Sequence, residues 1–272
     1  MKLTFLVDNK TEKPSCTAEW GLSILIETGG HTYLYDTGAS DMPVRNAAVL
    51  GADLSAVEAC MLSHGHYDHT EGLPAFCRVN SKAKIYLHEE GLHTARGTMD
   101  DHNSGIRWSK DFIASIQPRL VRTHGVWPVD ERLTLVGNLP NYDDFPPTDR
   151  FFITDLGGEP VPDPMNHEQF LAVFEGDAVH IISGCCHKGV VPTVRYAKQL
   201  FPDRRIASVT GGMHTFTLDA AERRRTIQAL MQLGVEKLLP MHCTGMNMIA
   251  DMRAAAGERC IIPCAGQTVT LA

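Results

Sequence analysis

The apolar and polar positions in the first third of the chain predict strands joined by tight turns. Residues 3–7, 22–27 and 32–36 are apolar runs of strand length. Gly29-Gly30 separates the last two runs and predicts a hairpin turn. Further along we expect a helix at 41–50 ended by Gly51, a strand at 57–63, a helix reaching about residue 80, and a strand at 84–87.

The middle of the chain has weaker patterns. Residues 91–108 are polar and contain glycine, which predicts a long loop. Because loops of this length are uncommon inside a compact domain, we expect it to be a lid or a pocket wall that contacts substrate. Residues 139–164 are rich in proline and are expected to cover the surface.

Regular patterns return in the last third. Gly176-Asp177 predicts a hairpin between strands at 169–174 and 178–183, and Thr217 is the expected N-cap of a helix at 218–233. This alternation of strands and helices predicts an α/β protein with mixed sheets, and no repeat or linker divides residues 1–272 into more than one domain. The other expected elements are helices at 190–201 and 246–256 and strands at 205–209, 236–241, near 259–262 and at 267–271.

Composition narrows the class of protein. Apolar residues make up 43% of the 272 positions and charged residues 21%, which is typical of a globular chain. The chain has 32 acidic and 25 basic residues, and its formal charge of −7 argues against a nucleic-acid-binding surface. No apolar run approaches the roughly 20 residues that span a bilayer, and Asp8 interrupts the only run that resembles a targeting peptide. We therefore expect a soluble, cytoplasmic protein; the sequence predicts no oligomeric state.

Cysteine and histidine have different meanings in this sequence. Eight cysteines are too few for a disulfide scaffold, and none forms the Cys-x-x-Cys pair of a structural zinc ribbon. The 13 histidines are more informative, because several of them directly follow apolar runs of strand length.

The strongest motif is the histidine-rich segment at residues 63–70. His64 and His66 are two positions apart, so in extended backbone their side chains point the same way. Asp68 and His69 follow at the expected start of a helix. Three imidazoles and one carboxylate can supply ligands to two metal ions that lie close together. The alternative is a solvated polar turn.

Six residues cannot complete two coordination spheres, so other strand ends should contribute. His187, His214 and His242 each follow an expected apolar strand within a few residues. In α/β sheets, functional groups gather beyond the carboxyl ends of the strands, which favours a shared site. The alternative for each is a histidine that caps its strand through a hydrogen bond.

These motifs together resemble the metallo-β-lactamase superfamily, and within it the subgroup named after 7,8-dihydropterin-6-ylmethyl-4-(β-D-ribofuranosyl)aminobenzene 5′-phosphate synthase. The resemblance implies an αββα sandwich of the metallo-β-lactamase type, in which helices flank two mixed sheets and a dinuclear metal site lies at one edge. The motifs that carry it, in the order typical of the subgroup, are Glu19-Trp20-Gly21-Leu22-Ser23, Tyr35-Asp36-Thr37-Gly38, Ser63-His64-Gly65-His66-Tyr67-Asp68-His69, Ser183-Gly184-Cys185-Cys186-His187, Gly211-Gly212-Met213-His214 and His242-Cys243-Thr244-Gly245.

The resemblance also implies a ligand set for two divalent transition-metal ions. One ion would be bound by His64, His66 and His187, and the other by Asp68, His69 and His242. Imidazole and carboxylate ligands suit Zn, with Mn or Fe as alternatives. Because no Gly-His-Thr motif lies between residues 70 and 180, His124 is the rival of His187 for the third position at the first ion.

Four further residues have two interpretations each. Cys185 stands where many relatives have a bridging aspartate, and it either bridges the ions or packs beneath them. Asp36 either orients a ligand imidazole or caps a turn. His214 is a candidate proton donor and phosphate contact, or a structural histidine. Lys188 binds phosphate or is solvated. Asp68 and His214 are the catalytic candidates.

The resulting hypothesis is a metal-dependent enzyme with a dinuclear site that acts on a small molecule bearing a phosphate or pyrophosphate. It would work by hydrolysis, or by pterin-methyl transfer with loss of pyrophosphate. The alternatives are a lactone or ester hydrolase and a non-catalytic metal- or ligand-binding protein. A redox di-iron protein is disfavoured, because such relatives usually have glutamate at the position of His66. No nucleic-acid or membrane partner is expected.

Overall fold

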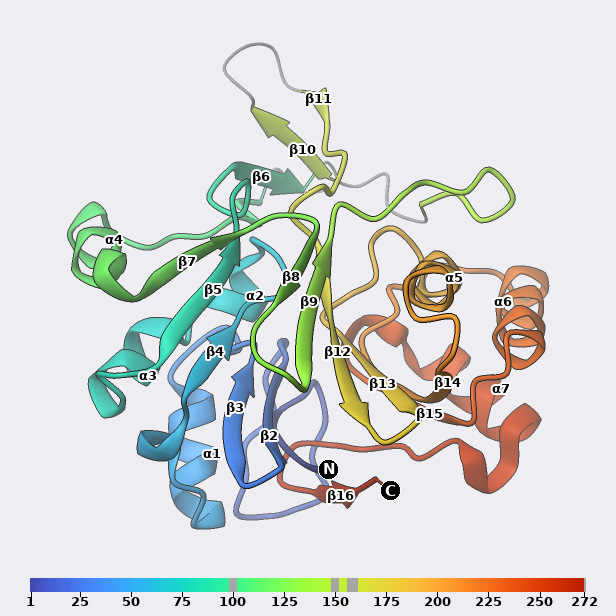
Figure 1. Cartoon of the computed structure of the whole chain (residues 1–272), viewed down its shortest axis with the longest axis horizontal. Helices are drawn as coiled ribbons and strands as arrows, with labels where there is room; N and C mark the ends of the chain where they lie inside the picture. Colours follow the sequence, from blue (N-terminus) through green and yellow to red (C-terminus); the bar gives the residue numbers. More distant parts are fainter. Residues whose placement is uncertain (98–101, 148–151, 156–160, 272) are drawn as a thin grey trace. The chain divides into compact units, whose positions relative to one another are not determined.

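The computed structural model describes residues 1–97, 102–147, 152–155 and 161–271 (Figure 1). The chain divides into two compact units, which we call unit 1 and unit 2. Unit 1 comprises Met1–Thr123, Phe151–His167 and Cys264–Ala272, and unit 2 comprises His124–Arg150 and Glu168–Pro263. The expectation of a single domain over residues 1–272 stays a prediction.

Unit 1 contains a mixed seven-stranded sheet in the order β16-β1-β2-β3-β4-β5-β7. The first four strands of this order pair antiparallel and the last four pair parallel, with β3 common to both sets. A small three-stranded sheet has the order β11-β10-β6. The strands of unit 1 are β1 (Lys2–Val7), β2 (Ser23–Thr28), β3 (His31–Tyr35), β4 (Ala59–Met61), β5 (Lys84–His88), β6 (Thr94–Gly97), β7 (Leu120–Thr123), β10 (Phe152–Asp155), β11 (Val161–Pro162) and β16 (Thr268–Thr270).

The helices of unit 1 bury one face of its large sheet. Phe76 and Ile116 from two of these helices pack with Leu34 and Ile85 of the sheet in one apolar core. The two chain ends lie side by side (Figure 1), because the Met1 amino group donates a hydrogen bond to the carbonyl of the C-terminal segment, 2.9 Å away. The helices are α1 (Met42–Leu50), α2 (Tyr67–Thr70), α3 (Leu73–Val79) and α4 (Lys110–Ile116), with the short 3₁₀ helices η1 (Leu54–Ala56) and η2 (Gln117–Arg119).

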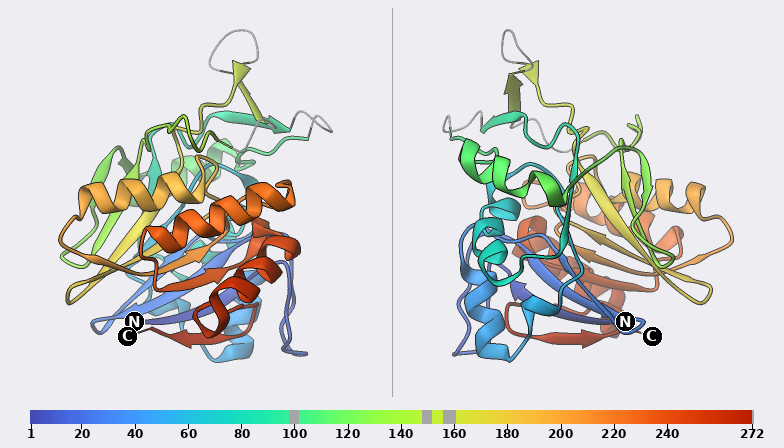
Figure 2. Two further views of the ribbon diagram at one scale, coloured as in Figure 1. Left: turned by 90° about the vertical axis from the view of Figure 1, so that its right-hand side faces the viewer. Right: turned by 60° about the vertical axis from the view of Figure 1, so that its left-hand side comes forward.

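Unit 2 contains a mixed six-stranded sheet in the order β15-β14-β13-β12-β9-β8. Three long helices lie together on this sheet (Figure 2), where Val194, Leu230 and Met252 share one apolar core with Ile181 and Val209 of the strands. The elements are β8 (Val126–Pro128), β9 (Leu133–Gly137), β12 (Gln169–Glu175), β13 (Ala178–Ser183), α5 (Val190–Leu200), β14 (Arg205–Gly211), α6 (Ala220–Gln232), β15 (Lys237–Pro240), η3 (His242–Thr244), α7 (Met246–Ala256) and η4 (Gly257–Arg259).

In each unit, neighbouring parallel strands have their carboxyl ends aligned, because their last residues are paired with each other. In unit 2, Ser183 pairs with Gly211 and Gly211 pairs with Pro240, so β13, β14 and β15 finish side by side. In unit 1, Tyr35 of β3 and Met61 of β4 are paired in the same way. The residues that follow these strands are therefore placed close together at one edge of each sheet.

The predicted α/β class, with two mixed sheets flanked by helices, is confirmed. The hairpins at 22–36 and 169–183 form as expected, and Gly29 and Gly30 both have positive φ, as their turn requires. Helices at 41–50, 190–201 and 246–256 and the central strands are confirmed within a few residues. No helix in the described parts of the chain is long and apolar enough to cross a membrane.

Several local predictions were wrong. Within the expected loop at 91–108, the described residues include strand β6, which pairs with β10; residues 98–101, the tip of the expected lid, lie outside the described residues. Strands β10 and β11 form within the expected surface segment 139–164, where β11 is exposed as a surface position requires; residues 148–151 and 156–160 are not described. Near 259–262 a single bridge between Leu238 and Cys260 replaces the expected strand.

Two helix boundaries also differ. The helix expected to reach residue 80 is divided into α2 and α3 at Gly72, where a Cβ atom would lie 2.5 Å from the Ser40 carbonyl oxygen. The N-cap of α6 is Asp219 rather than Thr217. The Asp219 carboxylate accepts from the amides of Ala221 and Glu222, and the Glu222 carboxylate accepts from the Asp219 amide. This reciprocal pair is a capping box, which satisfies amides that the first helical turn leaves without partners.

We expect Asp219→Ala to lower the free energy of unfolding by about 1 kcal/mol, because N-cap substitutions typically cost about 0.5–2 kcal/mol. Urea titration followed by circular dichroism measures this change. Thr217→Ala is the matched control and should leave the midpoint unchanged. Equal losses in the two variants would mean that the capping box does not stabilise α6.

Candidate metal centre

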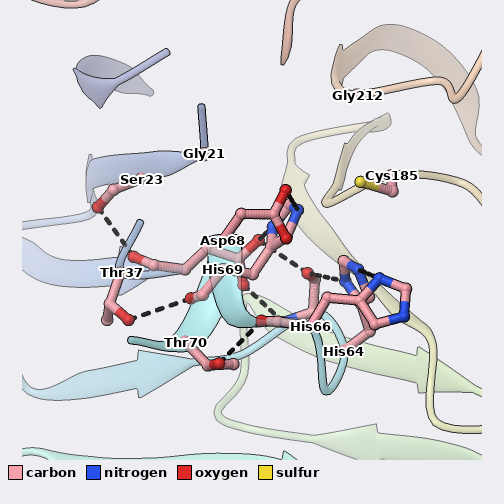
Figure 3. Close-up of polar contacts among 12 residues, drawn as sticks. Gly21, Ser23, Thr37, His64, His66, Asp68, His69, Thr70, Cys185 and Gly212 are labelled. Carbon is pink, nitrogen blue, oxygen red and sulfur yellow. Dashed lines mark hydrogen bonds and ion pairs between the residues drawn. The ribbon is translucent and has the colours of Figure 1, made fainter. Parts of the chain in front are cut away.

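The histidine-rich segment of unit 1 begins after β4 and continues into α2. His66 has extended backbone, so the buried rings of His64 and His66 lie against each other, with centroids 4.5 Å apart (Figure 3). His64 Nε2 and His66 Nδ1 are 3.0 Å apart. Two imidazole nitrogens on one tetrahedral Zn²⁺, at about 2.0–2.1 Å each, would lie about 3.3–3.4 Å apart. The spacing of this pair is therefore close to that of two ligands of one ion.

A second pair of donor atoms follows in the first turn of α2. Asp68 Oδ2 and His69 Nε2 are 3.7 Å apart, and both side chains are buried. The His69 ring also lies 4.2 Å from the His64 ring, centroid to centroid. All four residues that the sequence predicted in this segment are thus brought together in unit 1.

Asp36 lies directly beneath this cluster, at the end of β3. Its Oδ2 is 2.7 Å from His69 Nδ1 and accepts from the Ser63 hydroxyl at 2.7 Å. Its Oδ1 accepts from the Ser63 amide at 2.7 Å. Because the carboxylate accepts a hydrogen bond from Nδ1–H, the proton of the neutral ring is on Nδ1 and Nε2 keeps its lone pair, as in the carboxylate–histidine pairs of metal sites. The structure thus gives Asp36 a contact with a predicted ligand imidazole.

Backbone contacts fix the same segment. The Thr37 hydroxyl donates to the His69 carbonyl at 3.0 Å, and the Thr70 hydroxyl donates to the His66 carbonyl at 2.8 Å (Figure 3). A Cβ atom on Gly21 would lie 2.6 Å from the Asp68 carbonyl oxygen, so this position has no room for a larger residue. The turn that presents the four side chains is therefore held by side-chain hydrogen bonds to its backbone and by the close approach of Gly21.

One further histidine of unit 1 belongs to this region and was not predicted. The ring of His167 is nearly parallel to that of His64, at a centroid distance of 6.2 Å, and lies 5.8 Å from His66. Its Nδ1 accepts a hydrogen bond from the Gly65 amide at 3.1 Å. The sequence carries no signal for this role, because His167 follows no strand and belongs to no motif.

In unit 2, the predicted residues follow the level ends of β13, β14 and β15. Cys185, His187, His214 and His242 are all buried, and the rings of His187 and His214 have centroids 4.5 Å apart. His214 and His242 have φ of 44° and 50°, and Cys186 has φ of 56°. Non-glycine residues rarely adopt this left-handed region, and such strained positions are common at functional sites.

Cys243 was not assigned a role from the sequence but lies among these residues. One donor atom each from Cys185, His214 and Cys243 falls within 4.8 Å of the others. Burial alone raises the pKa of the Cys243 thiol, but hydrogen bonds with Cys185 and His214 and the imidazoles of His242 and His214 outweigh it and lower that pKa. A Cβ atom on Gly212 would lie 2.7 Å from Cys243 Sγ, so this glycine is required for close packing.

Lys188 is buried, which contradicts the alternative that it is solvated. Its ammonium group donates to the Asn141 side chain at 3.0 Å. The amides of His187 and Lys188 both donate to the buried carboxylate of Glu168, at 2.6 and 2.9 Å. Glu168 is thus a second residue that the sequence did not reveal.

His124, the rival of His187, is exposed in the short connection between β7 and β8. The other predicted ligands are buried at strand ends or in α2. The predicted ligand set therefore falls into two groups, with His64, His66, Asp68 and His69 in unit 1 and His187 and His242 in unit 2. Clustered imidazole, carboxylate and thiol groups form a donor set that suits Zn and related transition metals.

Comparisons with known proteins agree with this chemistry. The family model of the Metallo-beta-lactamase superfamily matches residues 21–242. In Methanocaldococcus jannaschii, the 7,8-dihydropterin-6-methyl-4-(beta-D-ribofuranosyl)-aminobenzene-5'-phosphate synthase is 28% identical over 85% of this chain and 82% of its own length. An uncharacterised protein of the same organism is 26% identical over 92% of this chain and 93% of its own length.

A solved structure described as a metal-dependent hydrolase of the beta-lactamase superfamily has a TM-score of 0.85 and 27% identity, and the match covers 100% of this chain and 99% of the other. Human tRNase Z, short form, has a TM-score of 0.56 at 13% identity and shares the fold. The fold is of the metallo-β-lactamase type, as the motifs predicted, and the chain belongs to the metallo-β-lactamase superfamily.

Proposed function

We propose that the chain is a metal-dependent enzyme that acts on a small molecule bearing a phosphate or pyrophosphate group. The superfamily and the buried donor groups support the metal dependence. The name of the archaeal synthase, which includes a 5'-phosphate, supports the class of substrate. Hydrolysis and pterin-methyl transfer are the two reactions that this proposal admits.

The observation that carries the metal site is the presence of two facing donor pairs in one short segment of unit 1. His64 with His66 forms one pair and Asp68 with His69 forms the other. We assign each pair to a different ion, and Zn is the proposed metal, with Mn or Fe as alternatives. The family match extends to residue 242, so it includes the remaining ligands that we assign, His187 for the first ion and His242 for the second.

The remaining residues have roles that follow from their contacts. Asp36 fixes the proton of His69 on Nδ1 and so leaves Nε2 to bind metal. The core of unit 2 includes Cys186, whereas Cys185 lies among donor atoms, which supports Cys185 as the bridging ligand in place of aspartate. We assign Asp68 to the catalytic centre as a ligand, His214 as proton donor and phosphate contact, and Lys188 as a buried positive charge for the phosphate.

Bound divalent ions supply Lewis-acid stabilisation of growing negative charge and lower the pKa of water. In hydrolysis, water attacks phosphorus and gives up a proton to the solvent, and the P–O bond to the leaving group breaks; His214 gives its own proton to the departing oxygen. In the transfer, the amino nitrogen of the aromatic acceptor attacks the pterin methylene, the C–O bond breaks, and pyrophosphate leaves with the electron pair. The nitrogen then loses its proton to the solvent. Both reactions need positive charge where oxygen becomes anionic.

The assignment of ligands predicts selective metal loss. We expect Asp68→Asn or His242→Ala to remove mainly one ion, and His64→Ala or His187→Ala the other, because each set shares one coordination sphere. Elemental analysis after dialysis against a weak chelator measures the metal-to-protein ratio. His124→Ala is the matched control and should keep the full metal content. An unchanged ratio in the double variant of His64→Ala and His242→Ala would contradict the metal site.

A catalytic role for His214 predicts a specific kinetic result. His214→Gln should lower kcat by about 10²–10⁴-fold, the usual contribution of a general acid or base, with both ions retained. Steady-state kinetics, metal analysis and thermal unfolding on the same sample separate the possibilities. Loss of one ion would instead identify His214 as a ligand, and loss of stability with normal kcat would identify it as structural.

A substrate panel tests the proposed reaction. We expect turnover of phosphate esters, or of a dihydropterin-methyl pyrophosphate, and little turnover of lactones and carboxylic esters. Pyrophosphate release that needs an added aromatic acceptor indicates transfer, whereas inorganic phosphate release without an acceptor indicates hydrolysis. Turnover of lactones or carboxylic esters alone would overturn the proposed substrate class.

A further inference from the structure

The backbone between the two facing histidines of unit 1 is held by contacts that the function proposed above does not use. Gly65 separates His64 from His66, and a Cβ atom at this position would collide with the Gly91 carbonyl oxygen. Next to it, His66 pairs with Gly105 in a single antiparallel bridge. The Gly65 amide itself donates to Nδ1 of His167, which is 102 positions away in sequence. The orientation of this peptide sets the direction of both ring-bearing residues.

The tautomer of His167 is set by its second nitrogen. Since Nδ1 accepts the Gly65 hydrogen bond, the proton of the neutral ring must be on Nε2. Nε2 lies 3.4 Å from Oδ2 of Asp163, which accepts a hydrogen bond from the Nε2–H group. The other carboxylate oxygen of Asp163 accepts from the Met165 amide at 2.7 Å, which shapes the turn that delivers His167. Both nitrogens of this buried ring therefore have protein partners, so His167 supports the segment rather than binding metal.

Glu168, the residue after His167, holds the backbone of a ligand-bearing loop in unit 2. The buried carboxylate of Glu168 accepts from the consecutive amides of His187 and Lys188. The His187 amide donates to Oε1 and the Lys188 amide to Oε2, and Cys186 before them is in the left-handed region, with φ of 56°. Successive amides in such a conformation form a concave site that favours an anion, and here the anion is a side chain of the protein. The direction of the His187 backbone thus depends on Glu168.

We propose that the consecutive residues His167 and Glu168 are positioning residues for the metal ligands, each through the backbone of one ligand-bearing loop. His167 fixes the peptide between His64 and His66, and Glu168 fixes the peptide of His187. All three of these histidines are assigned above to the first ion, so the proposal rests on the proposed function. Partners that orient metal ligands typically contribute about 10- to 100-fold to metal affinity or activity.

The role of His167 is tested by substitutions that keep or remove a hydrogen-bond acceptor for the Gly65 amide. His167→Leu removes it and should weaken binding of the first ion by about 10- to 100-fold. H167N keeps an oxygen near the position of Nδ1 and should retain most of the affinity. Chelator competition measures the affinity, and the d–d absorption of the Co²⁺-substituted protein reports the ligand geometry. The metal affinity and the Co²⁺ spectrum should both change in H167L, and both should stay close to those of the unsubstituted protein in H167N.

The same logic applies to Glu168, with a control for general loss of stability. Glu168→Ala leaves two amides without an acceptor, whereas E168Q keeps one accepting oxygen, so we expect a larger loss of affinity in E168A. His180→Leu is the control, because His180, like Glu168, is a buried polar residue of unit 2, and its Nδ1 lies 2.9 Å from the Ser208 hydroxyl oxygen within the sheet. It should lower the unfolding temperature without changing metal affinity or the Co²⁺ spectrum.

Three outcomes distinguish this inference from the proposal on which it rests. Weaker binding and an altered spectrum in H167L and E168A, with recovery in H167N, support it. If His64→Ala loses metal but H167L and E168A bind it as the unchanged protein does, the positioning role is wrong and the proposed function stands. If His64→Ala keeps all its metal, the metal site itself is wrong and the positioning role falls with it.

Discussion

The contact between the Asp36 carboxylate and His69 is the interaction on which the rest of unit 1's site depends. One buried carboxylate faces His69 Nδ1. It also accepts hydrogen bonds from both the amide and the hydroxyl of Ser63, the residue before His64. A buried carboxylate is costly unless its oxygens are satisfied, and here hydrogen bonds satisfy both. Because Asp36 follows β3 and Ser63 follows β4, the pairing of two parallel strands places the histidines before any metal binds.

Strain at the strand ends supports the same interpretation. Asp36, Cys186, His214 and His242 all have positive φ, although none is glycine. Each such residue costs about 1–3 kcal/mol, so the surrounding structure must compensate for it. At Asp36 the compensation is the hydrogen bonding just described, and at Cys186 it is the Glu168 carboxylate. All four residues lie just after the end of a strand. There the left-handed backbone turns the side chain in a direction that extended strand backbone does not allow.

The sequence was informative where the relevant residues are close together in the chain. The segment at 63–70 was found because its ligands are separated by at most one residue, and the strand ends were found because a histidine follows within a few residues of three apolar runs. The capping box of α6 was missed although Asp219 and Glu222 have the required spacing, since Thr217 is an equally acceptable cap residue. Strand β6 was missed because it is short and its partner β10 is distant in sequence.

His167 and Glu168 could not be predicted for a different reason. Their partners are backbone amides, which every residue except proline carries, so no residue type marks the position. Asn, Asp, Gln or Ser can also accept such bonds, and the distance of 102 positions between Gly65 and His167 leaves no local pattern. Metal ligands need particular side chains, whereas the residues that orient them need only an acceptor in the right place.

The same distinction applies to the choice of reaction. Hydrolysis and pterin-methyl transfer both develop negative charge on a phosphate oxygen, so one arrangement of ligands serves both. The reactions differ in the nucleophile, which is water in one and an aromatic amine in the other. That choice depends on how the substrate is shaped, held and shielded from water, and therefore on residues outside the ligand motifs. A superfamily can thus keep its histidine motifs while its members differ in chemistry.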